Sequence, residues 1–499
     1  MKRRFRGLRR PPETRYDAVV IGAGVGGLLT ACLLAREGLR VLLMEQHYMV
    51  GGYCSTFRRG GFTFDAATHF YPVLGNPETR LGRLLRELGV ATEWVAMDPV
   101  DTFHFPDGSS FAVPADFDAY RRRLDEEFPA ERESLERFFA DVRSIYLHGA
   151  LAFFRQRTTP VFDHWSSRTL WQELVSRFRD PRLRLLLTAD CPHWGSPPER
   201  ISFVFDSMLR MTYFLGNYYP KGSSQHFADE LARVLESFGG EILTSTAARR
   251  IEVRDGRAVA VEAETLRGPF AGRHRVEAGV VVSNADWWVT FDELLGHEPV
   301  AREWVRAGHG LRRSHPCYLV HVGLEGADPR RLEEVQGYYW QDWDPNRMAE
   351  GSLLCKVFVP TAYDPDLAGG PGRQIVILQK VLAVDWSAIE DWQRHKAGIE
   401  ALGLEHLSTL IPGIRERIVT VQTASARTSW RFTRNREGAM LGWEMSPDQV
   451  GDGRPGTRGP IASLFLVGHW VQPGGGIVPV LESARRVARE VLADREGPA

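Results

Sequence analysis

The chain has 499 residues, of which 43% are hydrophobic and 25% are charged, a balance typical of globular proteins. This composition excludes a disordered, collagen-like or coiled-coil protein, and the length suffices for about three domain-sized units. With 62 basic and 63 acidic residues the formal net charge is −1, so no overall field attracts nucleic acid, and we expect no nucleic-acid partner.

Cysteine usage and hydropathy indicate the compartment. The 5 cysteines are an odd number without C-x-x-C spacing, which favours a reducing compartment over disulfide staples. No run approaches the roughly 18 apolar residues of a membrane-spanning helix. Residues 1–15 are rich in arginine but lack the apolar stretch of a secretory signal, so they are either a disordered tail or a polybasic contact with anionic lipid. We therefore expect a cytoplasmic protein, with contact to a membrane surface as an open alternative.

The first predicted elements form a strand, a turn, a helix and a second strand. Residues 16–21 are a β-branched apolar run typical of a buried parallel strand, residues 28–37 are expected to be helical, and residues 40–44 form the next strand. The turn before the helix has the spacing G-x-G-x-x-G, with its glycines at Gly22, Gly24 and Gly27.

Each glycine of this turn has a mechanical role. Gly22 permits the tight turn, Gly24 lets the backbone approach a pyrophosphate, and Gly27 lets the helix pack on the sheet. The helix N-terminus offers unpaired N–H groups to phosphate oxygens. Glu45, about 20 residues further on, is placed to accept hydrogen bonds from a ribose. Because the turn lies between two predicted strands, the segment predicts a dinucleotide-binding site.

Two further glycine-rich segments favour FAD over NAD. Gly51 and Gly52 follow the second strand, where a glycine pair lets the backbone pass a ligand that extends beyond the pyrophosphate. Near the other end, residues 464–467 are a predicted buried strand and residues 478–492 a predicted helix. The glycine-rich turn between them is expected to offer N–H groups to the pyrimidine edge of a flavin. Its candidate residues are Gly468, His469, Gly475, Gly476 and Ile477.

At these residues the chain resembles the phytoene desaturase and carotenoid cis–trans isomerase family of FAD-dependent oxidoreductases, which includes retinol saturase. This family lies within the wider amine-oxidase and GDI-like group. The similar motifs are GAGVGG with Glu45, GGYCSTF, GFTFDAATHFYP, YYPKGSSQHFADELARVLESFGGEI, VVSNADWW and LFLVGHWVQPGGGIVPVLESA. Their order along the chain is more specific than any one of them.

The resemblance implies an α/β fold in which a Rossmann-type FAD-binding domain, of the GR2 or amine-oxidase type, holds an inserted α+β substrate domain. The expected boundaries are a basic tail over 1–15, FAD-binding pieces over 16–89, 218–290 and 456–499, and substrate-domain pieces over 90–217 and 291–455. In the middle FAD-binding piece the expected elements are a helix ending at 239–240 and strands at 241–243, 251–253, 258–263 and 280–282. In the family, a strand near 251–253 lies against the adenine.

The sequence departs from the family pattern at two histidines. Many relatives have an acidic residue after the C-terminal strand, where this chain has His469 following Gly468. His69, in FDAATHFY, resembles the retinol saturase branch, which leaves the direction of hydride transfer open. His69 is the candidate catalytic residue, a polar group near the isoalloxazine; the alternative is a structural histidine in a turn.

The remaining aromatic and apolar segments allow two interpretations each. The densest aromatic cluster, at residues 338–343, is either core or part of a long apolar tunnel, and only the resemblance favours a tunnel. The apolar stretch over 142–154 is either an interior helix or an element resting on a bilayer.

The resemblance implies a reaction on a carotenoid or related isoprenoid polyene, a hydrophobic partner. The reaction would be desaturation or flavin-assisted cis–trans isomerisation, by hydride exchange with flavin N5. The alternatives are a retinol-saturase-like reductase, a flavin amine oxidase, or a GDI-like prenyl-binding protein without redox chemistry. Since the sequence has no metal-ligand spacing, Walker loop or G-x-S-x-G elbow, we expect no metal site. Oligomeric state leaves no signal in the sequence.

Overall fold

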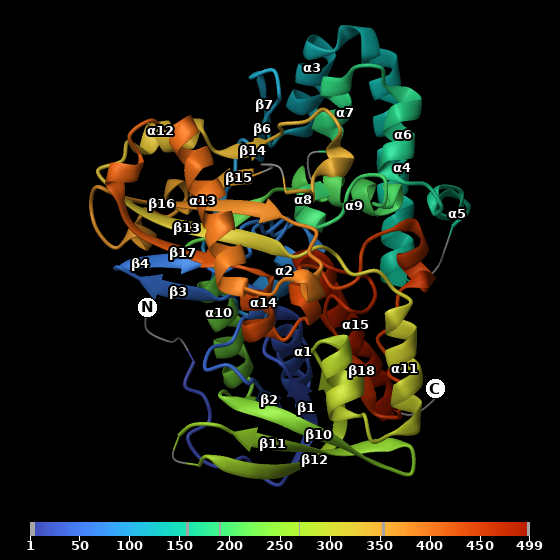
Figure 1. Ribbon diagram of the computed structural model, residues 1–499. Helices are drawn as coiled ribbons and strands as arrows, with labels where there is room; N and C mark the ends of the chain where they lie inside the picture. Colours follow the sequence, from blue (N-terminus) through green and yellow to red (C-terminus); the bar gives the residue numbers. More distant parts are fainter. Residues whose placement is uncertain (1–4, 156–158, 189–190, 269, 352–354, 497–499) are drawn as a thin grey trace.

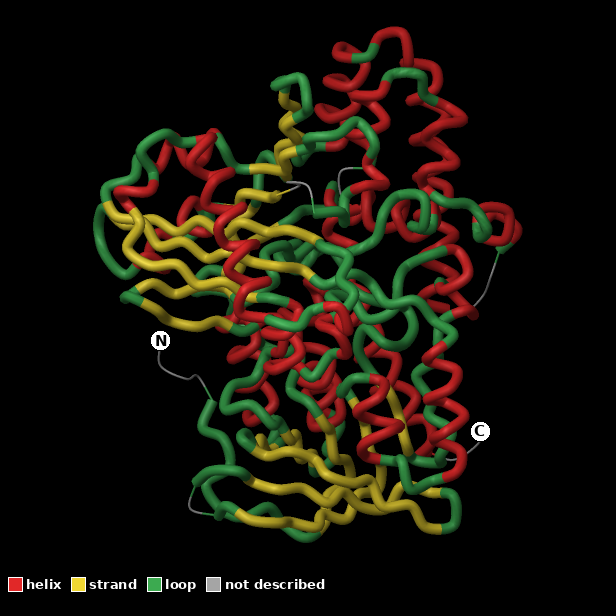
Figure 2. Tube along the Cα trace, in the orientation of Figure 1, coloured by secondary structure: helices red, strands yellow, loops and turns green. Residues whose placement is uncertain are grey.

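A computed structural model of the protein describes residues 5–155, 159–188, 191–268, 270–351 and 355–496. Two seven-stranded sheets organise these residues (Figure 1). In this view the first sheet lies at the bottom and the second at the upper left, with a group of helices at the upper right. Figure 2 shows further helices in the region between the two sheets.

The first sheet has the strand order β10-β11-β12-β1-β2-β9, with β18 paired to β12. Its strands are β1 (Arg15–Ile21), β2 (Val41–Met44), β9 (Glu241–Leu243), β10 (Thr246–Arg254), β11 (Arg257–Thr265), β12 (Gly272–Ser283) and β18 (Leu464–Leu466). β1 pairs in parallel with β2 and β12, β9 and β18 extend the parallel part, and β10, β11 and β12 form an antiparallel arm. Strands from three distant stretches of the chain therefore share one sheet.

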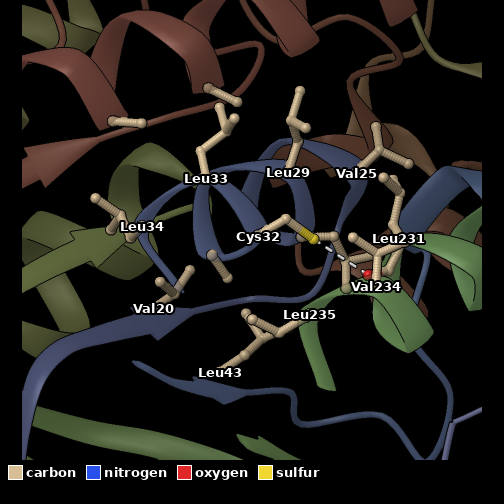
Figure 3. Packing of buried hydrophobic residues seen from close by; sticks show 14 of the residues in the cluster. Val20, Val25, Leu29, Cys32, Leu33, Leu34, Leu43, Leu231, Val234 and Leu235 are labelled. Atoms are coloured by element: carbon tan, nitrogen blue, oxygen red, sulfur yellow. Dashed lines mark hydrogen bonds between the residues drawn. The ribbon is translucent and has the colours of Figure 1, made fainter. Parts of the chain in front are cut away.

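Both faces of the parallel part are buried, which explains its continuous apolar runs. On one face lie Val20 and Val282, covered by α1 (Val25–Arg36), α10 (Ser224–Ser237) and α15 (Ile477–Glu496). Figure 3 shows α1 packed against α10, with the Cys32 thiol donating to the carbonyl oxygen of Leu231 at 3.1 Å. On the other face, Val19 and neighbouring residues pack against the antiparallel arm and a tryptophan-rich segment that precedes α11 (Pro299–His309).

The second sheet has the order β17-β13-β16-β15-β14-β6-β7 and is antiparallel except where β14 meets β6. Its strands are β6 (Asp101–His104), β7 (Ser110–Val113), β13 (Cys317–Glu325), β14 (Gly337–Tyr339), β15 (Cys355–Phe358), β16 (Arg373–Val381) and β17 (Ile418–Ala424). Two further pairs are β3 (Thr56–Arg59) with β4 (Phe62–Asp65), and β5 (Trp94–Ala96) with β8 (Tyr218–Pro220).

Most of the remaining helices form the group at the upper right (Figure 1). They are α2 (Arg80–Glu87), α3 (Phe117–Glu127), α4 (Arg132–Arg155), α5 (Pro160–Trp165), α6 (Leu170–Arg177), α7 (Pro181–Leu187), α8 (Cys191–Trp194), α9 (Phe203–Tyr213), α12 (Pro329–Glu334), α13 (Trp392–Leu410) and α14 (Ala426–Thr433). The hairpin β3–β4 belongs with the second sheet in packing terms, because Phe62 and Phe64 are buried against Leu319 and Ile375. Sequence analysis places that hairpin within the first FAD-binding piece.

The N-terminal segment is ordered where the structure describes it. Phe5 is only 4% exposed, the backbone N–H groups of Arg6 and Gly7 donate to the Glu236 carboxylate, and the Leu8 N–H donates to the Ile242 carbonyl. The hypothesis of a disordered tail over 1–15 is therefore wrong for residues 5–15; residues 1–4 lie outside the described part.

The apolar stretch over 142–154 is part of α4. Val142 and Ile145 are buried in the core that α4 forms with α3, α6, α7 and α9. Leu147, in contrast, is 65% exposed. One face of the helix is thus interior; the side chains from 150 to 154 lie outside the described residues. Among the described residues, no helix is long and apolar enough to cross a membrane.

Candidate active site

A pocket of about 400 Å³ lies at the carboxyl edge of the first sheet and extends to the second. Gly22 directly follows β1, Glu45 follows β2, Asn284 follows β12, and Gly468 comes shortly after β18. Because the carboxyl ends of parallel strands meet at one edge, residues distant in sequence converge there, which is where open α/β sheets bind ligands.

Most of the predicted site residues line this pocket: Gly22, Gly24, Glu45, Gly51, Gly52, His69, Gly468, His469, Gly476 and Ile477. Gly27 and Gly475 lie behind its wall instead. A Cβ at position 27 would lie 2.1 Å from the carbonyl oxygen of Gly22, and one at position 475 would lie 2.4 Å from that of Leu441. Both glycines therefore permit close packing of the backbone rather than contact with a ligand.

The turn before α1 is a cradle for phosphate. No described side chain caps the helix at Gly24, so its first N–H groups remain available to an anion. The Gly51 N–H donates to the Ala23 carbonyl at 2.7 Å and ties the second glycine segment to the first. The amide of Asn284 reaches between these turns: a Cβ at position 24 would lie 2.8 Å from Nδ2, and one at position 468 would lie 2.9 Å from Oδ1.

Glu45 is fixed at the end of β2. Its Oε2 accepts the Ala23 N–H at 2.7 Å and its Oε1 accepts the His47 N–H at 2.8 Å, and burial raises its pKa. Each carboxylate oxygen keeps a lone pair for a further donor. Beside it, β10 lines the pocket with residues 246–249. In the strand that contains the expected residues 251–253, it is the start rather than 251–253 that lines the pocket.

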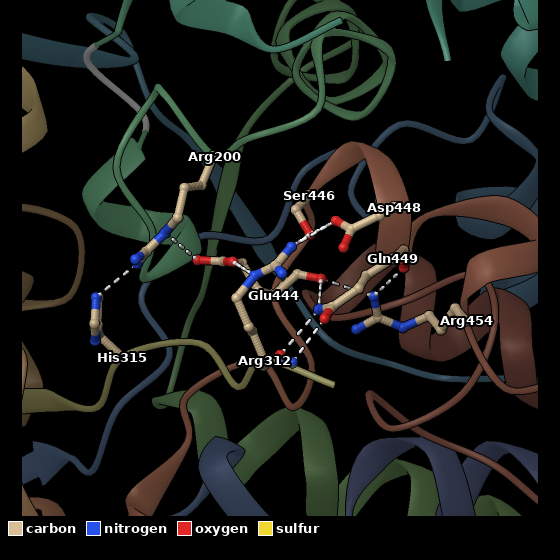
Figure 4. Close-up of polar contacts among 8 residues, drawn as sticks. All are labelled: Arg200, Arg312, His315, Glu444, Ser446, Asp448, Gln449 and Arg454. Atoms are coloured by element: carbon tan, nitrogen blue, oxygen red, sulfur yellow. Dashed lines mark hydrogen bonds and ion pairs between the residues drawn. The ribbon is translucent and has the colours of Figure 1, made fainter. Parts of the chain in front are cut away.

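The C-terminal turn is held from behind by a buried polar network (Figure 4). Arg454 is 2% exposed, and its guanidinium donates to the carbonyl oxygens of Trp443 at 2.8 Å and His469 at 3.1 Å. In the same network, Glu444 lies between Arg200 and Arg312, at 2.9 and 3.0 Å. The Arg454 guanidinium thereby satisfies the His469 carbonyl of the glycine-rich turn and joins it to the carbonyl of Trp443 in a neighbouring segment.

His469 is a neutral group in this turn. Burial, followed by repulsion from Arg454, lowers its pKa to about 3. Its Nε2 lies 3.0 Å from Oδ1 of Asn435, which also accepts the indole N–H of Trp470 at 3.1 Å. The position therefore offers no negative charge, in contrast to the acidic residue expected in many relatives.

These features fit FAD. The uncapped N-terminus of α1 suits the diphosphate, the Glu45 carboxylate suits the ribose hydroxyls, and the N-terminus of α15, where Gly476 and Ile477 line the pocket, suits an electron-rich ring edge. Glycine is required at positions 24 and 468, because a Cβ at either position would collide with the Asn284 amide.

His69 lies across the pocket from the first sheet and its glycine turn, against Phe358 of the second sheet. It is 3% exposed, its ring stacks on Phe358 with centroids 4.6 Å apart, and neither ring nitrogen has a hydrogen-bond partner among the described residues. Burial, with repulsion from Lys356 as the next cause, lowers its pKa well below the usual value. The imidazole is therefore neutral at physiological pH.

The rest of this wall is mainly apolar. It includes Phe70, Leu209, Tyr213, Leu319, Met440 and Leu441, with Trp194 from α8 and Gln379 from β16. The aromatic cluster at 338–343 does not form it: Tyr338 and Trp340 are buried in the neighbouring core, and Trp343 is 36% exposed. These rings therefore belong to the core that forms where β14 packs against β6 rather than to this wall.

A comparison with protein families shows to which family the chain belongs. The family described as flavin containing amine oxidoreductase matches residues 25–492. The chain belongs to this family. This confirms the expected fold and an FAD-dependent oxidoreductase, and it agrees with the fit of the pocket to FAD.

The oxidoreductase is similar to three known proteins over most of its length. It is 27% identical to prolycopene isomerase 1 from an Oncidium hybrid cultivar over 512 residues, covering 96% of this chain and 84% of that one. It is 26% identical over 540 residues to all-trans-retinol 13,14-reductase from Macaca fascicularis, covering 97% and 86%. A solved putrescine oxidase variant superposes with a TM-score of 0.66 at 16% identity, covering 97% and 100%.

Sequence reasoning missed several residues of the oxidoreductase's pocket. Asn284 follows a predicted strand within a matched motif, but only the structure shows its amide between the glycine turns. Asn435 and Gln379 carry no motif at all, and neither does Arg454, which lies behind the C-terminal turn. The continuous apolar run of β16, Ile375 to Leu378, could have indicated a strand buried on both faces, but not what either face contacts.

Proposed function

We propose that this oxidoreductase acts on an isoprenoid polyene, by desaturation or by cis–trans isomerisation. The observation that carries the proposal is the continuity of the pocket. One cavity joins the FAD-fitting glycine edge to an apolar wall that includes Phe70, Leu209, Leu319 and Met440. An apolar wall suits a hydrocarbon chain. The motifs shared with phytoene desaturases and the similarity to a prolycopene isomerase support the same class of substrate.

The chain's own residues position FAD and the polyene and exclude water from them. When bound, FAD supplies hydride exchange, and we propose that Gly22, Gly24, Glu45, Gly51 and Gly52 hold its nucleotide half. The turn at Gly468, His469, Gly476 and Ile477 would face its flavin half. The buried wall excludes water from the polyene, which favours reaction between aligned partners. His69, neutral and without a partner in the described residues, would contact the substrate and fix its orientation.

The direction of hydride transfer is a separate question. The similarity to a retinol 13,14-reductase, together with His69, favours reduction as the alternative reaction on the same class of substrate. An amine substrate fits less well, because the carboxylates among the lining residues are otherwise engaged: Glu45 stands at the glycine edge, and Glu293 pairs with Arg434 at 2.7 Å.

Product analysis tests the proposal. Without oxygen, purified protein loaded with FAD is incubated with prolycopene, phytoene or putrescine together with a quinone as electron acceptor. After reduction of its flavin with dithionite, it is incubated with prolycopene or all-trans-retinol. Each polyene is then examined by chromatography and its absorption spectrum. We expect a changed double-bond pattern in at least one polyene. Protein carrying Gly24→Val, in which the new side chain collides with Asn284, should lose both FAD and activity. Oxidation of putrescine with no change in any polyene would replace the proposal by amine oxidation.

A further inference from the structure

A row of four tryptophans, called the tryptophan row below, leads from the pocket to helix α11. Trp470, in the C-terminal turn, lines the pocket beside His469. Its ring centroid lies 4.8 Å from that of Trp443, which in turn lies 5.8 Å from that of Trp287. Trp287 stacks on Trp304 of α11 at 5.3 Å, with an angle of 18° between the ring planes. Each step falls within the roughly 4.5–7 Å over which aromatic rings pack against each other, so the row is continuous.

Exposure changes only at the outer end of the tryptophan row. Trp470, Trp443 and Trp287 are 3%, 0% and 3% exposed, whereas Trp304 is half-buried on α11. A charge on one of the inner rings is costly, because the interior does not solvate it as water does. A positive charge that enters the row is therefore most stable at Trp304, where water reaches the ring.

Packing alone does not account for tryptophan at the centre of the row. The Trp443 side chain is fully buried, and its indole N–H has no hydrogen-bond partner among the described residues. An unpaired buried donor is destabilising, and a phenylalanine in the same core would avoid it. Indole also differs from phenyl in that it gives up an electron far more readily. The residue type therefore suits the passage of electrons as well as the filling of a core.

The charges around Trp443 distinguish its two outer neighbours, Trp287 and Trp288. The guanidinium groups of Arg436 and Arg313 lie 4.6 and 5.4 Å from the ring centroid of Trp288. Each cation is attracted to the neutral ring but would repel a ring that had lost an electron. An electron is therefore drawn more readily from Trp287, which continues the row, than from Trp288, which lies beside it.

We propose that the tryptophan row carries single electrons from the surface to the pocket, driven by blue light absorbed by bound FAD. Flavin at rest is too weak an oxidant to take an electron from indole, whereas flavin excited by blue light is strong enough. This activity requires bound FAD and is independent of the reaction with a polyene.

The electrons and protons of this route balance. One electron leaves Trp470 for the excited cofactor, and electrons from Trp443, Trp287 and Trp304 refill the vacancies in turn. The oxidised Trp304 ring releases its indole proton to water, and a thiol in solution then gives a hydrogen atom to the resulting neutral radical. The net change moves one electron from the thiol to the pocket, releases one proton and leaves a thiyl radical. Light and thiol thus reduce the cofactor without a reductase protein.

A blue flash on the purified, FAD-loaded protein tests the route. Tryptophan does not absorb blue light, so a tryptophanyl radical seen by transient absorption and electron paramagnetic resonance reports electron transfer from the protein. We expect such a radical in the unaltered protein. Trp443→Phe should shorten its lifetime at least about tenfold, because the phenyl ring raises the barrier to the next step and the vacancy returns from Trp470. Under steady blue light with dithiothreitol and without oxygen, the flavin absorption band should also bleach more slowly in this variant.

Trp287→Phe and Trp288→Phe are the matched pair, because the two residues are adjacent in the chain and 3% and 4% exposed. Trp287→Phe should shorten the radical lifetime as Trp443→Phe does, whereas Trp288→Phe should leave it within about twofold. Trp304→Phe should shorten it too, and its half-buried position keeps the test available if a buried variant fails to fold. All variants are compared at equal bound FAD.

A protein that binds FAD but forms no tryptophanyl radical would overturn the proposed route. Equal lifetimes in the unaltered protein and in Trp443→Phe or Trp304→Phe would overturn it as well, as would a lifetime that falls in Trp288→Phe and not in Trp287→Phe. Since no polyene enters these measurements, their failure leaves the proposed function intact.

Discussion

At the scale of single residues, the pocket is distinguished by three histidines in its lining. His69 is fully buried and His193 and His469 are partly buried, and in each case burial is the main cause of a lowered pKa. The pocket therefore presents neutral imidazoles at physiological pH. Neutral side chains suit a reaction in which the protein positions an apolar substrate and keeps water out.

His69→Ala tests the positioning role. We expect unchanged FAD content and a turnover per flavin lowered about 10- to 100-fold, because a substrate held less well reaches the reactive geometry less often. His69→Gln should recover part of the loss. Since burial holds the His69 pKa well below 6.5, turnover of the unaltered protein should show no inflection near that pH from this residue. These rates are measured with whichever polyene reacts.

His406→Ala is the matched control, because His406 is also buried with an unpaired Nε2 but lies outside the pocket. It should leave turnover per flavin unchanged. If His69→Ala also left turnover per flavin unchanged, His69 would be a structural residue of its turn.

Asp65→Asn tests a buried carboxyl group close to His69 in the sequence. Asp65 is 1% exposed, accepts hydrogen bonds from the Tyr219 hydroxyl and the Ser224 N–H, and has its pKa raised by burial from 3.8 to about 6. The folded state therefore binds this proton more tightly than the unfolded state. The stability it contributes is complete below about pH 4 and is lost as the pH rises through 6, a change of about 3 kcal/mol.

The variant stays neutral, so its stability relative to the unaltered protein should rise between pH 4 and 7.5, as measured by urea unfolding midpoints. Asp118→Asn, at an exposed position of α3, is the control for a surface carboxyl group. Parallel curves for Asp65→Asn and the unaltered protein would contradict the prediction.

At the scale of elements, the sequence predicted those helices, strands and turns that depend on the spacing of neighbouring residues. The glycine turn, the start of α15 and the strands of the first sheet follow from residue spacing, and observed bounds such as Val25–Arg36 and Ile477–Glu496 differ from the predicted ones by a few residues at each end. What depends on pairing between distant strands was missed. Gln379 and Lys356 become neighbours only through the register of β15 and β16, and Asn284 meets Gly468 only because β12 pairs with β18.

The C-terminal turn gives a prediction for an element. Arg454→Met removes a donor from four carbonyl oxygens, those of Trp443, Glu444, Gln449 and His469, of which Glu444 keeps Nε2 of Gln449 as a second donor. Because each carbonyl left unpaired costs about 1–3 kcal/mol, the turn should loosen and the dissociation constant of FAD should rise at least tenfold. Flavin fluorescence measures that constant.

Arg458→Met is the control, since Arg458 is half exposed and pairs with Asp494 at the surface, where an ion pair contributes little. It should leave FAD affinity within about twofold. Equal FAD affinity in Arg454→Met and in the unaltered protein would show that the turn keeps its shape without the buried guanidinium.

At the scale of the whole molecule, two sheets built from interleaved pieces of chain share one pocket. We propose the domain boundaries 16–89, 218–290 and 456–499 for the FAD-binding unit, and 90–217 and 291–455 for the substrate unit. All seven strands of the first sheet fall within the three FAD-binding pieces or at their edge, β1 beginning at Arg15. The hairpin β3–β4 crosses this division in space, because Phe62 and Phe64 pack on the second sheet. Such a crossing ties the two units together at the pocket.

The most direct test of the whole account is a titration of purified, FAD-loaded protein followed by the visible spectrum of its flavin in the absence of oxygen. FAD should remain bound after removal of the excess, and prolycopene or all-trans-retinol should change the flavin spectrum in a saturable manner while putrescine leaves it unchanged. A protein that retains no FAD, or a flavin that responds to putrescine and to neither polyene, would contradict this expectation.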